Sequence, residues 1–332
     1  MNNTEKKKSR DMASFREIGL LLFIVLISII IEVRNPSYLT VENFMDLLTN
    51  TSILGILAVG MMMILLTGGI DLSIGAVVAL SGMTASIAVS KVPSLNPIIC
   101  ILIGCGVGLA AGVINGFFVA KCKILPIIAT LGMMNVFRGL TYIVSGGKWV
   151  SAYQMSDNFK AIGTTKVLGI NILIIMAIVI FVIFYYFINF TRTGRYIYAV
   201  GSNPVSAEIT GINKTKVLWL TYSLMGIISG FAGVLWVSKF ASAQGDTASG
   251  YEMNVIAACV LGGVSVSGGN GKVSGLLLGT LLLGILNNAL PLINVSTFWQ
   301  NFIQGAVILF AIIMNAMVKR RADQANLRRR KI

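Results

Sequence analysis

Long apolar runs, separated by short polar segments, follow one another along nearly the whole chain. Each run is about 20 residues long, which is the length that an α-helix needs to cross the hydrocarbon core of a bilayer. Charged residues, glycine and proline mark many of the ends. We predict ten membrane-spanning helices, near residues 17–33, 51–67, 71–90, 97–119, 124–145, 168–190, 216–238, 252–267, 273–290 and 297–318.

The segment YLTVENFMDLLTN at residues 38–50 has a different pattern. Its apolar residues recur at helical spacing, with Glu42 and Asp46 between them. Amphipathic helices of this kind lie in the membrane interface. We therefore predict an interfacial helix here, outside the membrane plane, before the second span begins.

The composition excludes a water-soluble fold. Of the 332 residues, 56% are hydrophobic and 11% are charged, whereas soluble domains have about 25% charged residues. A soluble chain of this length cannot bury so much apolar surface. The predicted fold class is therefore all-α, a polytopic membrane helix bundle. Residues 17–318 form its transmembrane domain, between a basic N-terminal segment at 1–16 and a basic tail at 319–332.

Lysine and arginine residues predict the orientation of the bundle. These residues collect in the cytoplasmic segments of membrane proteins, and both terminal segments are strongly basic. An even number of spans puts both termini on one side, so both are predicted to be cytoplasmic, together with the loop 191–216. The net charge of +14 then lies at the membrane edges, facing an anionic lipid bilayer. This distribution disfavours a nucleic-acid partner.

Glycine residues recur at helical spacing within the spans. Lipid gives helices no hydrophobic reason to associate, so close approach depends on small residues. The fourth and seventh spans carry such residues, at Gly104, Gly108, Gly112 and Gly116 and at Gly226, Gly230 and Gly233. These positions predict close helix packing and a compact bundle.

Two glycine-rich turns resemble each other: TGGIDLSIG at 67–75 and SGGNGKVSG at 267–275. The second contains a Gly-Lys pair, but Val266 and Val273 stand where a P-loop needs its first glycine and its Ser or Thr. Any ATP that drives this protein is therefore hydrolysed by a different polypeptide. Both turns are predicted at cytoplasmic edges, with Asp71 and Asn270 capping the next helix. The structural turn residues are Gly68, Gly69, Asp71, Gly268 and Gly269.

The cytoplasmic loop 191–216 contains a short predicted helix. Asn203 at the N-cap, Pro204 in the first turn and Gly211 beyond the end predict a helix at 204–210. A helix of this length is unstable alone, so it needs contacts on both sides. A helix for docking a partner and an ordinary amphipathic connector both fit this pattern.

Three segments in register carry a resemblance to a known family. They are LTGGIDLSIGAVVALSG, GRYIYAVGSNPVSAEITGI and GYEMNVIAACVLGGVSVSGGNGKVSGLLLGTLLLGILNN. These segments resemble those of ribose-type ABC importer permeases, which include ribose, xylose, arabinose, galactoside, rhamnose and autoinducer-2 systems. The resemblance extends in the same order from about residue 36 to residue 318.

The resemblance implies a bacterial cell-membrane permease that imports a monosaccharide or similar small polyol by alternating access. It also implies an ATP-binding subunit, an extracytoplasmic sugar-binding protein, and a second permease copy or a related permease. ATP and Mg²⁺ would belong to the ATP-binding subunit, with no cofactor, metal or catalytic residue on this chain. The short helix is similar to the coupling helix that sits in a cleft of the ATPase, with residues Asn203, Pro204, Ala207, Glu208, Ile209 and Gly211.

Polar residues within the spans are the candidates for the solute path, because polar groups in a bilayer usually face protein or a cavity. They are Asn115, Asn135, Arg138, Asn287, Asn288, Trp299, Gln300 and Gln304. Hydrogen bonding between helices explains each of them equally well, except that the charge of Arg138 needs water or a partner. Asp71 is a counter-ion for Arg138 only if the fold brings opposite membrane faces together.

Three alternatives remain. A stand-alone secondary transporter typically needs ionisable residues within spans and broken helices in both halves, whereas this chain has Asp71 and Glu252 near span ends and no histidine. A receptor or structural membrane protein is disfavoured because the chain has no sizeable soluble domain. An ABC permease for a non-sugar solute such as a nucleoside is the third alternative.

Overall fold

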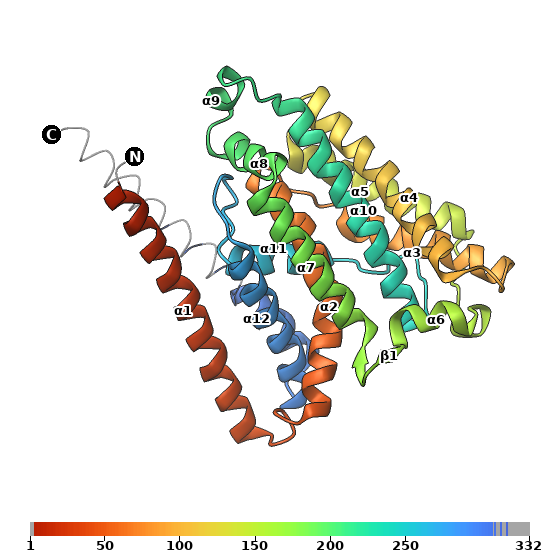
Figure 1. The fold of residues 1–332 in the computed structure, drawn as a ribbon. Helices are drawn as coiled ribbons and strands as arrows, with labels where there is room; N and C mark the ends of the chain where they lie inside the picture. The colour runs from red at the N-terminus through yellow and green to blue at the C-terminus, as the bar shows by residue number, and fades with distance from the viewer. Residues whose placement is uncertain (1–2, 308, 310–312, 314–316, 318–332) are drawn as a thin grey trace.

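The computed structural model describes residues 3–307, 309, 313 and 317, with residues 3–16 described by their backbone alone. Most of these residues are helical, and a short antiparallel hairpin forms a two-stranded sheet (Figure 1). The elements are α1 (Asn3–Arg34), α2 (Val41–Leu66), α3 (Ile74–Lys91), α4 (Pro97–Gly116), the π-helical turn η1 (Phe117–Lys121), α5 (Pro126–Ser145), the 3₁₀ turn η2 (Ala152–Gln154), α6 (Asp157–Thr164), β1 (Lys166–Val167), β2 (Ile170–Asn171), α7 (Ile172–Phe190), α8 (Arg192–Ser202), α9 (Pro204–Ile209), α10 (Lys214–Phe240), α11 (Tyr251–Leu261) and α12 (Val273–Leu292), followed by a helical stretch at 297–307.

The helices confirm a polytopic membrane bundle. In the described part of the chain, seven are long and apolar enough to cross a membrane: α2, α3, α4 with η1, α5, α7, α10 and α12. The helix α11 is apolar but shorter, with 11 residues. Apolar side chains cover the outer faces of α1, α5 and α7, as lipid contact requires.

The number of crossings and the side of the termini stay predictions. The first residues of α1 and the helix α9 lie at the same end of the bundle (Figure 1). That arrangement agrees with a cytoplasmic N-terminus. The side chains of 1–16 and the basic tail 319–332 lie outside the described residues.

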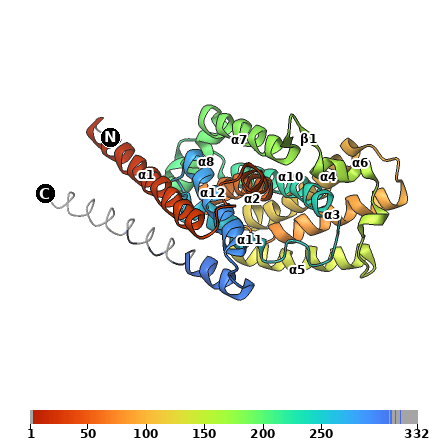
Figure 2. The same ribbon diagram turned by 90° about the horizontal axis from the view of Figure 1, so that it is seen from below.

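The helix α2 is central and begins earlier than the sequence pattern predicts. It runs without a break from Val41 to Leu66, and Thr40 caps it by accepting a hydrogen bond from the backbone N–H of Asn43 at 3.3 Å. A separate interfacial helix at 38–50 is therefore wrong. No glycine or proline interrupts the first half of α2, so its polar and apolar halves form one helix. The helices α7, α10 and α12 surround it (Figure 2).

The glycine-bearing faces of α4 and α10 pack against each other, as predicted. A methyl group added to Gly108 would overlap the carbonyl oxygen of Gly226 and lie 2.7 Å from the Cα atom of Gly230. Further along α10, Gly233 continues this contact onto α3, where Gly82 faces it. Backbone-to-backbone packing of this kind is available only to residues without a side chain. It fixes α10 between α3 and α4.

The helices α3 and α11 begin inside the bundle. Ser73, just before α3, is fully buried, and Glu252 in the first turn of α11 is 8% exposed. Their N-terminal ends meet, because a methyl group on Gly75 would lie 2.7 Å from a carboxylate oxygen of Glu252. Each half of the chain thus contains one helix that begins in the protein interior.

The glycines of the two turns have different roles. Gly68, Gly268 and Gly269 have positive φ angles of 78°, 87° and 72°, which glycine adopts without a steric penalty. Gly69 does not have a positive φ and serves close packing instead. A methyl group there would lie 2.9 Å from the hydroxyl oxygen of Tyr222.

Neither polar residue of these turns caps the next helix. Asp71 accepts a hydrogen bond of 2.8 Å from the backbone N–H of Ser73, the residue directly before α3. This bond closes a turn before the helix, and α3 begins without a side-chain cap, so capping by Asp71 is wrong. Asp71 is also buried inside the bundle and not at its edge. The helix α12 begins after Lys272 without a side-chain cap, so capping by Asn270 is wrong. The loop before α12 is held instead by backbone hydrogen bonds.

Candidate functional site

A cavity of about 240 Å³ lies between α2, α10, α11 and α12. Gly284 allows α12 to approach α2 here, because a methyl group on Gly284 would lie 2.7 Å from the Cγ2 atom of Thr51. After α10, Ala241 adopts a left-handed conformation with φ 48° and turns the chain toward α11. Pockets for drug-sized ligands begin at about 300 Å³, so this cavity suits a smaller solute.

One wall of the cavity is aromatic. Trp236 lies next to Phe240 and Tyr251, with ring centroids 5.3 Å and 4.8 Å away. Trp236 and Phe240 are four residues apart and so share one face of α10, and Tyr251 is the first residue of α11. Aromatic rings offer a rigid apolar surface together with polar edges. Such a wall can hold the apolar face of a small polyol.

Lys239 and Asn50 supply polar groups to the same cavity. The Lys239 amino group donates a hydrogen bond of 2.6 Å to the side-chain oxygen of Asn50 and one of 3.4 Å to the backbone oxygen of Thr49. It also lies 5.0 Å from the ring centroid of Phe240. In the described part of the chain, no carboxylate pairs with this amino group. The cavity therefore combines a cation with neutral oxygen acceptors.

Asn287 and Asn288, both predicted from the sequence, line the cavity from α12. The amides of Asn288 and Asn43 exchange two hydrogen bonds, of 3.0 Å and 3.1 Å. The side-chain oxygen of Asn287 accepts a bond of 2.6 Å from Gln304. Cavity lining and hydrogen bonding between helices therefore coexist in these two residues.

Arg138 lies on α5 and binds the loop between α10 and α11. Its guanidinium group donates hydrogen bonds of 2.8 Å to the backbone oxygens of Gly245 and Thr247. Gly245 also packs closely on the ring of Tyr142. No ion pair joins Arg138 to Asp71 within the described residues. The charge of Arg138 thus positions the loop that leads into α11.

Asn115 belongs to a separate buried cluster at the start of α3. Its amide donates a hydrogen bond of 2.8 Å to the hydroxyl of Ser73, which in turn donates one of 2.7 Å to Asp71. Asn115 is 1% exposed and does not line the cavity. The cluster joins α4 to the start of α3.

The other predicted residues lie elsewhere. Asn135 is exposed on α5 and donates a hydrogen bond to a backbone oxygen of its own helix. Trp299 is exposed, and Gln300 bonds to the turn just before its own helix. The fold does not bring these residues to Asn287 and Asn288, and a role in the solute path stays a prediction for each.

The sequence candidates do not include Asn50, Trp236, Lys239 or Tyr251, which also line the cavity. A signal exists for two of them, because Trp236 and Lys239 are three residues apart in the last turns of α10 and share a face with Phe240. Asn50 and Tyr251 have no comparable signal, since they reach the cavity from distant parts of the chain.

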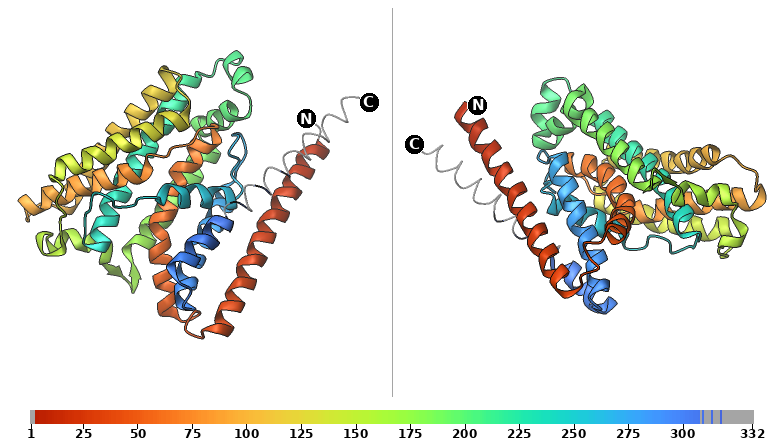
Figure 3. Two further views of the ribbon diagram at one scale, coloured as in Figure 1. Left: turned by 180° about the vertical axis from the view of Figure 1, so that it is seen from behind. Right: turned by 60° about the horizontal axis from the view of Figure 1, so that its bottom comes forward.

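The helix α9 lies near the first residues of α10, whereas the cavity lies near its last residues (Figure 1). It projects beyond the neighbouring helices (Figure 3). The side-chain oxygen of Asn203 accepts a hydrogen bond of 3.0 Å from the backbone N–H of Ser206. Pro204 is the first helical residue, and Gly211 has a φ of 85° beyond the end. The predicted short helix and its caps are therefore confirmed.

Two apolar side chains of α9 point away from the bundle. Ala207 is buried, whereas Val205 is 68% exposed and Ile209 is 81% exposed. Glu208 is also exposed. Exposed apolar side chains grouped on a projecting element are typical of a contact surface for another protein.

Comparison with known proteins matches residues 43–312 to the family described as branched-chain amino acid transport system / permease component. The ribose import permease protein RbsC of Bacillus subtilis (strain 168) is 40% identical over 94% of this chain and 96% of that protein. RbsC of Escherichia coli (strain K12) is 37% identical over 90% and 92%. The L-arabinose transport system permease protein AraH of Escherichia coli (strain K12) is 35% identical over 90% of each chain. No solved structure matches this chain.

Proposed function

Because this chain belongs to the branched-chain amino acid transport system / permease component family, as a ribose-type ABC importer permease, we propose that it imports a pentose. The chain is the multi-pass permease subunit of a sugar importer in the cell membrane, and ATP is hydrolysed by a separate subunit. Ribose and L-arabinose, named for relatives that match almost end to end, are both pentoses. This supports a five-carbon sugar as the solute.

The projecting helix α9 is the observation that supports coupling to an ATP-binding subunit. Its caps fix a helix of six residues that is too short to persist alone, and it exposes Val205 and Ile209. A surface of this kind suits a cleft in a cytoplasmic partner. We assign that partner as the ATP-binding subunit, with α9 as its coupling helix.

In this mechanism, ATP binding draws two ATP-binding subunits together, and α9 moves with the cleft that holds it. The bundle then alternates between an outward-open and an inward-open state, and a sugar-binding protein delivers the solute from outside. The ATP-binding subunits bind the outward-open and inward-open states with different affinities, and this difference drives the change between the two states.

The cavity between α2, α10, α11 and α12 supports a role in the solute path. An uncharged sugar needs hydrogen-bonding groups for its hydroxyls and an apolar surface for its C–H face. Asn287, Asn288 and Lys239 provide the first, and Trp236 and Tyr251 provide the second. We propose that these residues contact the sugar as it passes.

The exposed amide of Asn135 supports a neighbouring permease. An amide that faces lipid is unfavourable, and Asn135 is exposed on α5 among apolar side chains. A second copy, or a related permease, beside α5 would place this amide against protein or in a water-filled path between the two subunits.

The solute is tested by uptake into vesicles that contain the permease with its ATP-binding subunit and sugar-binding protein. We expect ATP-dependent uptake of labelled ribose or arabinose, and competition by the unlabelled pentose. Uptake of a nucleoside or a branched-chain amino acid, with no uptake of pentoses, would refute the pentose assignment. Uptake without any ATP-binding subunit would favour the secondary transporter.

The role of α9 is tested with Ile209→Pro and Glu208→Arg. Both should reduce ATP-driven uptake while the permease stays in the membrane, because the first breaks the helix and the second reverses a charge on its exposed face. Tyr153→Ala, at an 87% exposed position in the turn η2, is the matched surface control for assembly with the ATP-binding subunit. Normal uptake by both α9 variants would end the coupling assignment.

A further inference from the structure

Three backbone segments meet where α8 ends. A methyl group on Gly201 would overlap the backbone oxygen of Leu66 and would lie 2.7 Å from the backbone nitrogen of Gly269. A methyl group on Gly268 would lie 2.8 Å from the backbone oxygen of Gly201 and 3.0 Å from the backbone nitrogen of Gly68. The end of α8 is therefore in direct backbone contact with both glycine-rich turns.

Hydrogen bonds hold these segments together. The backbone N–H of Gly269 donates a bond of 2.9 Å to the oxygen of Leu66. From α8, the hydroxyl of Tyr198 donates a bond of 2.8 Å to the backbone oxygen of Gly271. Burial raises the pKa of Tyr198 to about 12, so its hydroxyl keeps its proton at neutral pH and remains a donor.

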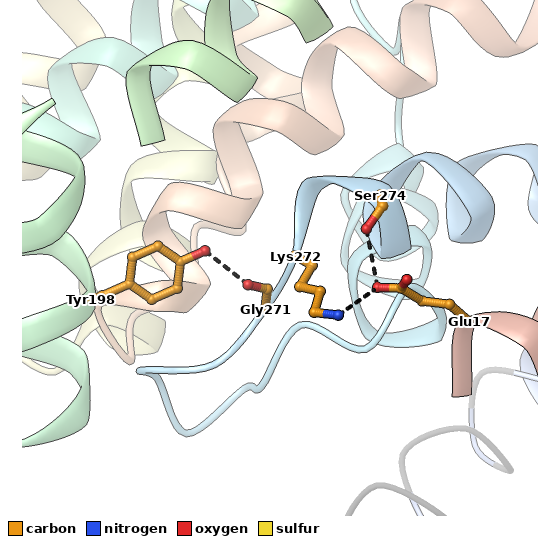
Figure 4. A network of polar contacts seen from close by, with 5 residues as sticks. All are labelled: Glu17, Tyr198, Gly271, Lys272 and Ser274. Atoms are coloured by element: carbon orange, nitrogen blue, oxygen red, sulfur yellow. Dashed lines mark hydrogen bonds and ion pairs between the residues drawn. The ribbon is translucent and has the colours of Figure 1, made fainter. Parts of the chain in front are cut away.

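The same loop also contacts α1. Lys272 and Ser274 both bind the carboxylate of Glu17, at 3.3 Å and 3.0 Å (Figure 4). Tyr198 reaches this loop from the opposite side in the same view. The loop thus connects α8 with α1 and, through its last residues, with the start of α12.

Both contacted segments lead into helices of the bundle, and two of these helices, α11 and α12, line the cavity. The segment after Leu66 leads into α3, and the loop 262–272 joins α11 to α12. The residue after α8 is Asn203, the cap of α9. A displacement of α9 therefore reaches both halves of the chain through one point, and closely packed backbones transmit displacement with little compression.

We propose that Tyr198 and Gly201 are positioning residues that transmit the movement of α9 to α3 and α12 together. The inference rests on the proposed function, because it requires α9 to be the coupling helix. Tyr198 ties α8 to the loop before α12, and Gly201 lets α8 touch both turns without an intervening side chain. Loss of either contact should separate ATP hydrolysis from transport without removing the docking surface.

The test uses the complete importer in vesicles and measures ATP hydrolysed per sugar taken up. Tyr198→Phe removes the bond to Gly271 and should raise this ratio about fivefold, the change that one net hydrogen bond makes in an equilibrium. Tyr196→Phe is the matched control. Tyr196 lies on the same helix and is exposed, and its hydroxyl makes no hydrogen bond within the described residues. A merely structural loss would lower both rates together and leave the ratio unchanged.

Gly201→Ala is the second variant and should uncouple more strongly, because its methyl group overlaps backbone. Gly106→Ala, at a helical glycine with no atom within 4 Å of the added group, is its control. Equal ratios for Tyr198→Phe, Tyr196→Phe and the unmodified importer would overturn the proposal. It would stand if the ratio rises for Tyr198→Phe and Gly201→Ala, but not for Tyr196→Phe or Gly106→Ala, while each variant still co-purifies with the ATP-binding subunit.

Cross-linking separates a failure of this inference from a failure of the proposed function. Ile209→Cys should cross-link to the ATP-binding subunit in every α8 variant. If the cross-link forms and the ratio does not change, the transmission role is wrong while α9 remains the docking helix. If no cross-link forms even without an α8 substitution, α9 is not the docking helix and both proposals are overturned.

Discussion

The amide pair between Asn43 of α2 and Asn288 of α12 allows a quantitative test of how the cavity is held. Asn288→Leu removes both hydrogen bonds of the pair, of 3.0 Å and 3.1 Å, and leaves the side-chain oxygen of Asn43 without this partner. The Asn43 amide keeps its bond of 2.7 Å to the backbone oxygen of Tyr38. A hydrogen bond between membrane helices contributes about 0.6 kcal/mol on average.

The two bonds together therefore contribute about 1.2 kcal/mol. The unpaired oxygen adds about 1 kcal/mol of desolvation. Asn288→Leu should then lower the free energy of unfolding by about 2 kcal/mol, and Asn43→Leu by a similar amount. The two changes remove the same bonds, and the double variant leaves no unpaired amide oxygen from this pair, so it should lose only about 1 kcal/mol.

The assay is reversible unfolding of the purified permease in mixed micelles, with increasing denaturing detergent, for the four members of this cycle. A coupling energy of about 3 kcal/mol is expected. Strictly additive losses would show that the pair contributes nothing in the membrane protein, and the reasoning from these distances would be refuted.

Uptake by the same variants separates packing from contact with the sugar. Asn288 lines the cavity and Asn43 does not, although both lose the same bonds. Asn288→Leu should therefore slow uptake more than Asn43→Leu, at matched amounts of folded permease and with the ATP-binding subunit still bound. Equal uptake by the two variants would assign Asn288 to packing alone.

Three further substitutions test the helix packing, the loop before α11 and the outer surface. Gly108→Leu forces a side chain between α4 and α10 and should lower the free energy of unfolding by about 1–3 kcal/mol. Gly106→Leu is the control, because open space surrounds Gly106. Equal losses for the two variants in detergent unfolding would contradict the packing. Arg138→Met removes two charge-assisted hydrogen bonds to the loop between α10 and α11 and should speed amide exchange in that loop about tenfold. Unchanged exchange, measured by mass spectrometry, would show that these bonds do not stabilise the loop. The hydrogen bond from Lys160 lowers the pKa of Asp157, so any stabilisation from this pair is present above the ordinary pKa of an aspartate and is lost as the pH falls. Lys160→Gln should return the titration of Asp157 to its ordinary range in a carbon NMR experiment, and an unshifted titration would exclude the pair in solution.

The sequence by itself determined the helices that are specified by residues close together in the chain. Apolar runs of membrane length predict the helices, because each run must satisfy its own backbone in lipid. Asn203, Pro204 and Gly211 define α9 to within one residue, because caps act through bonds to the nearest backbone groups. The glycine-bearing faces of α4 and α10 were equally predictable, because residues three or four positions apart lie on one face of a helix.

Tertiary structure alone decided which of these faces meet and where polar residues converge. One cavity is lined from separate helices by Asn50, Lys239 and Asn288. Gly201 contacts two turns that are distant from it in the sequence, one before it and one after it. Asp71, in the turn before α3, is buried inside the bundle, and its burial depends on the helices packed around it. These contacts depend on the relative placement of several helices at once. No periodicity within one helix carries that information.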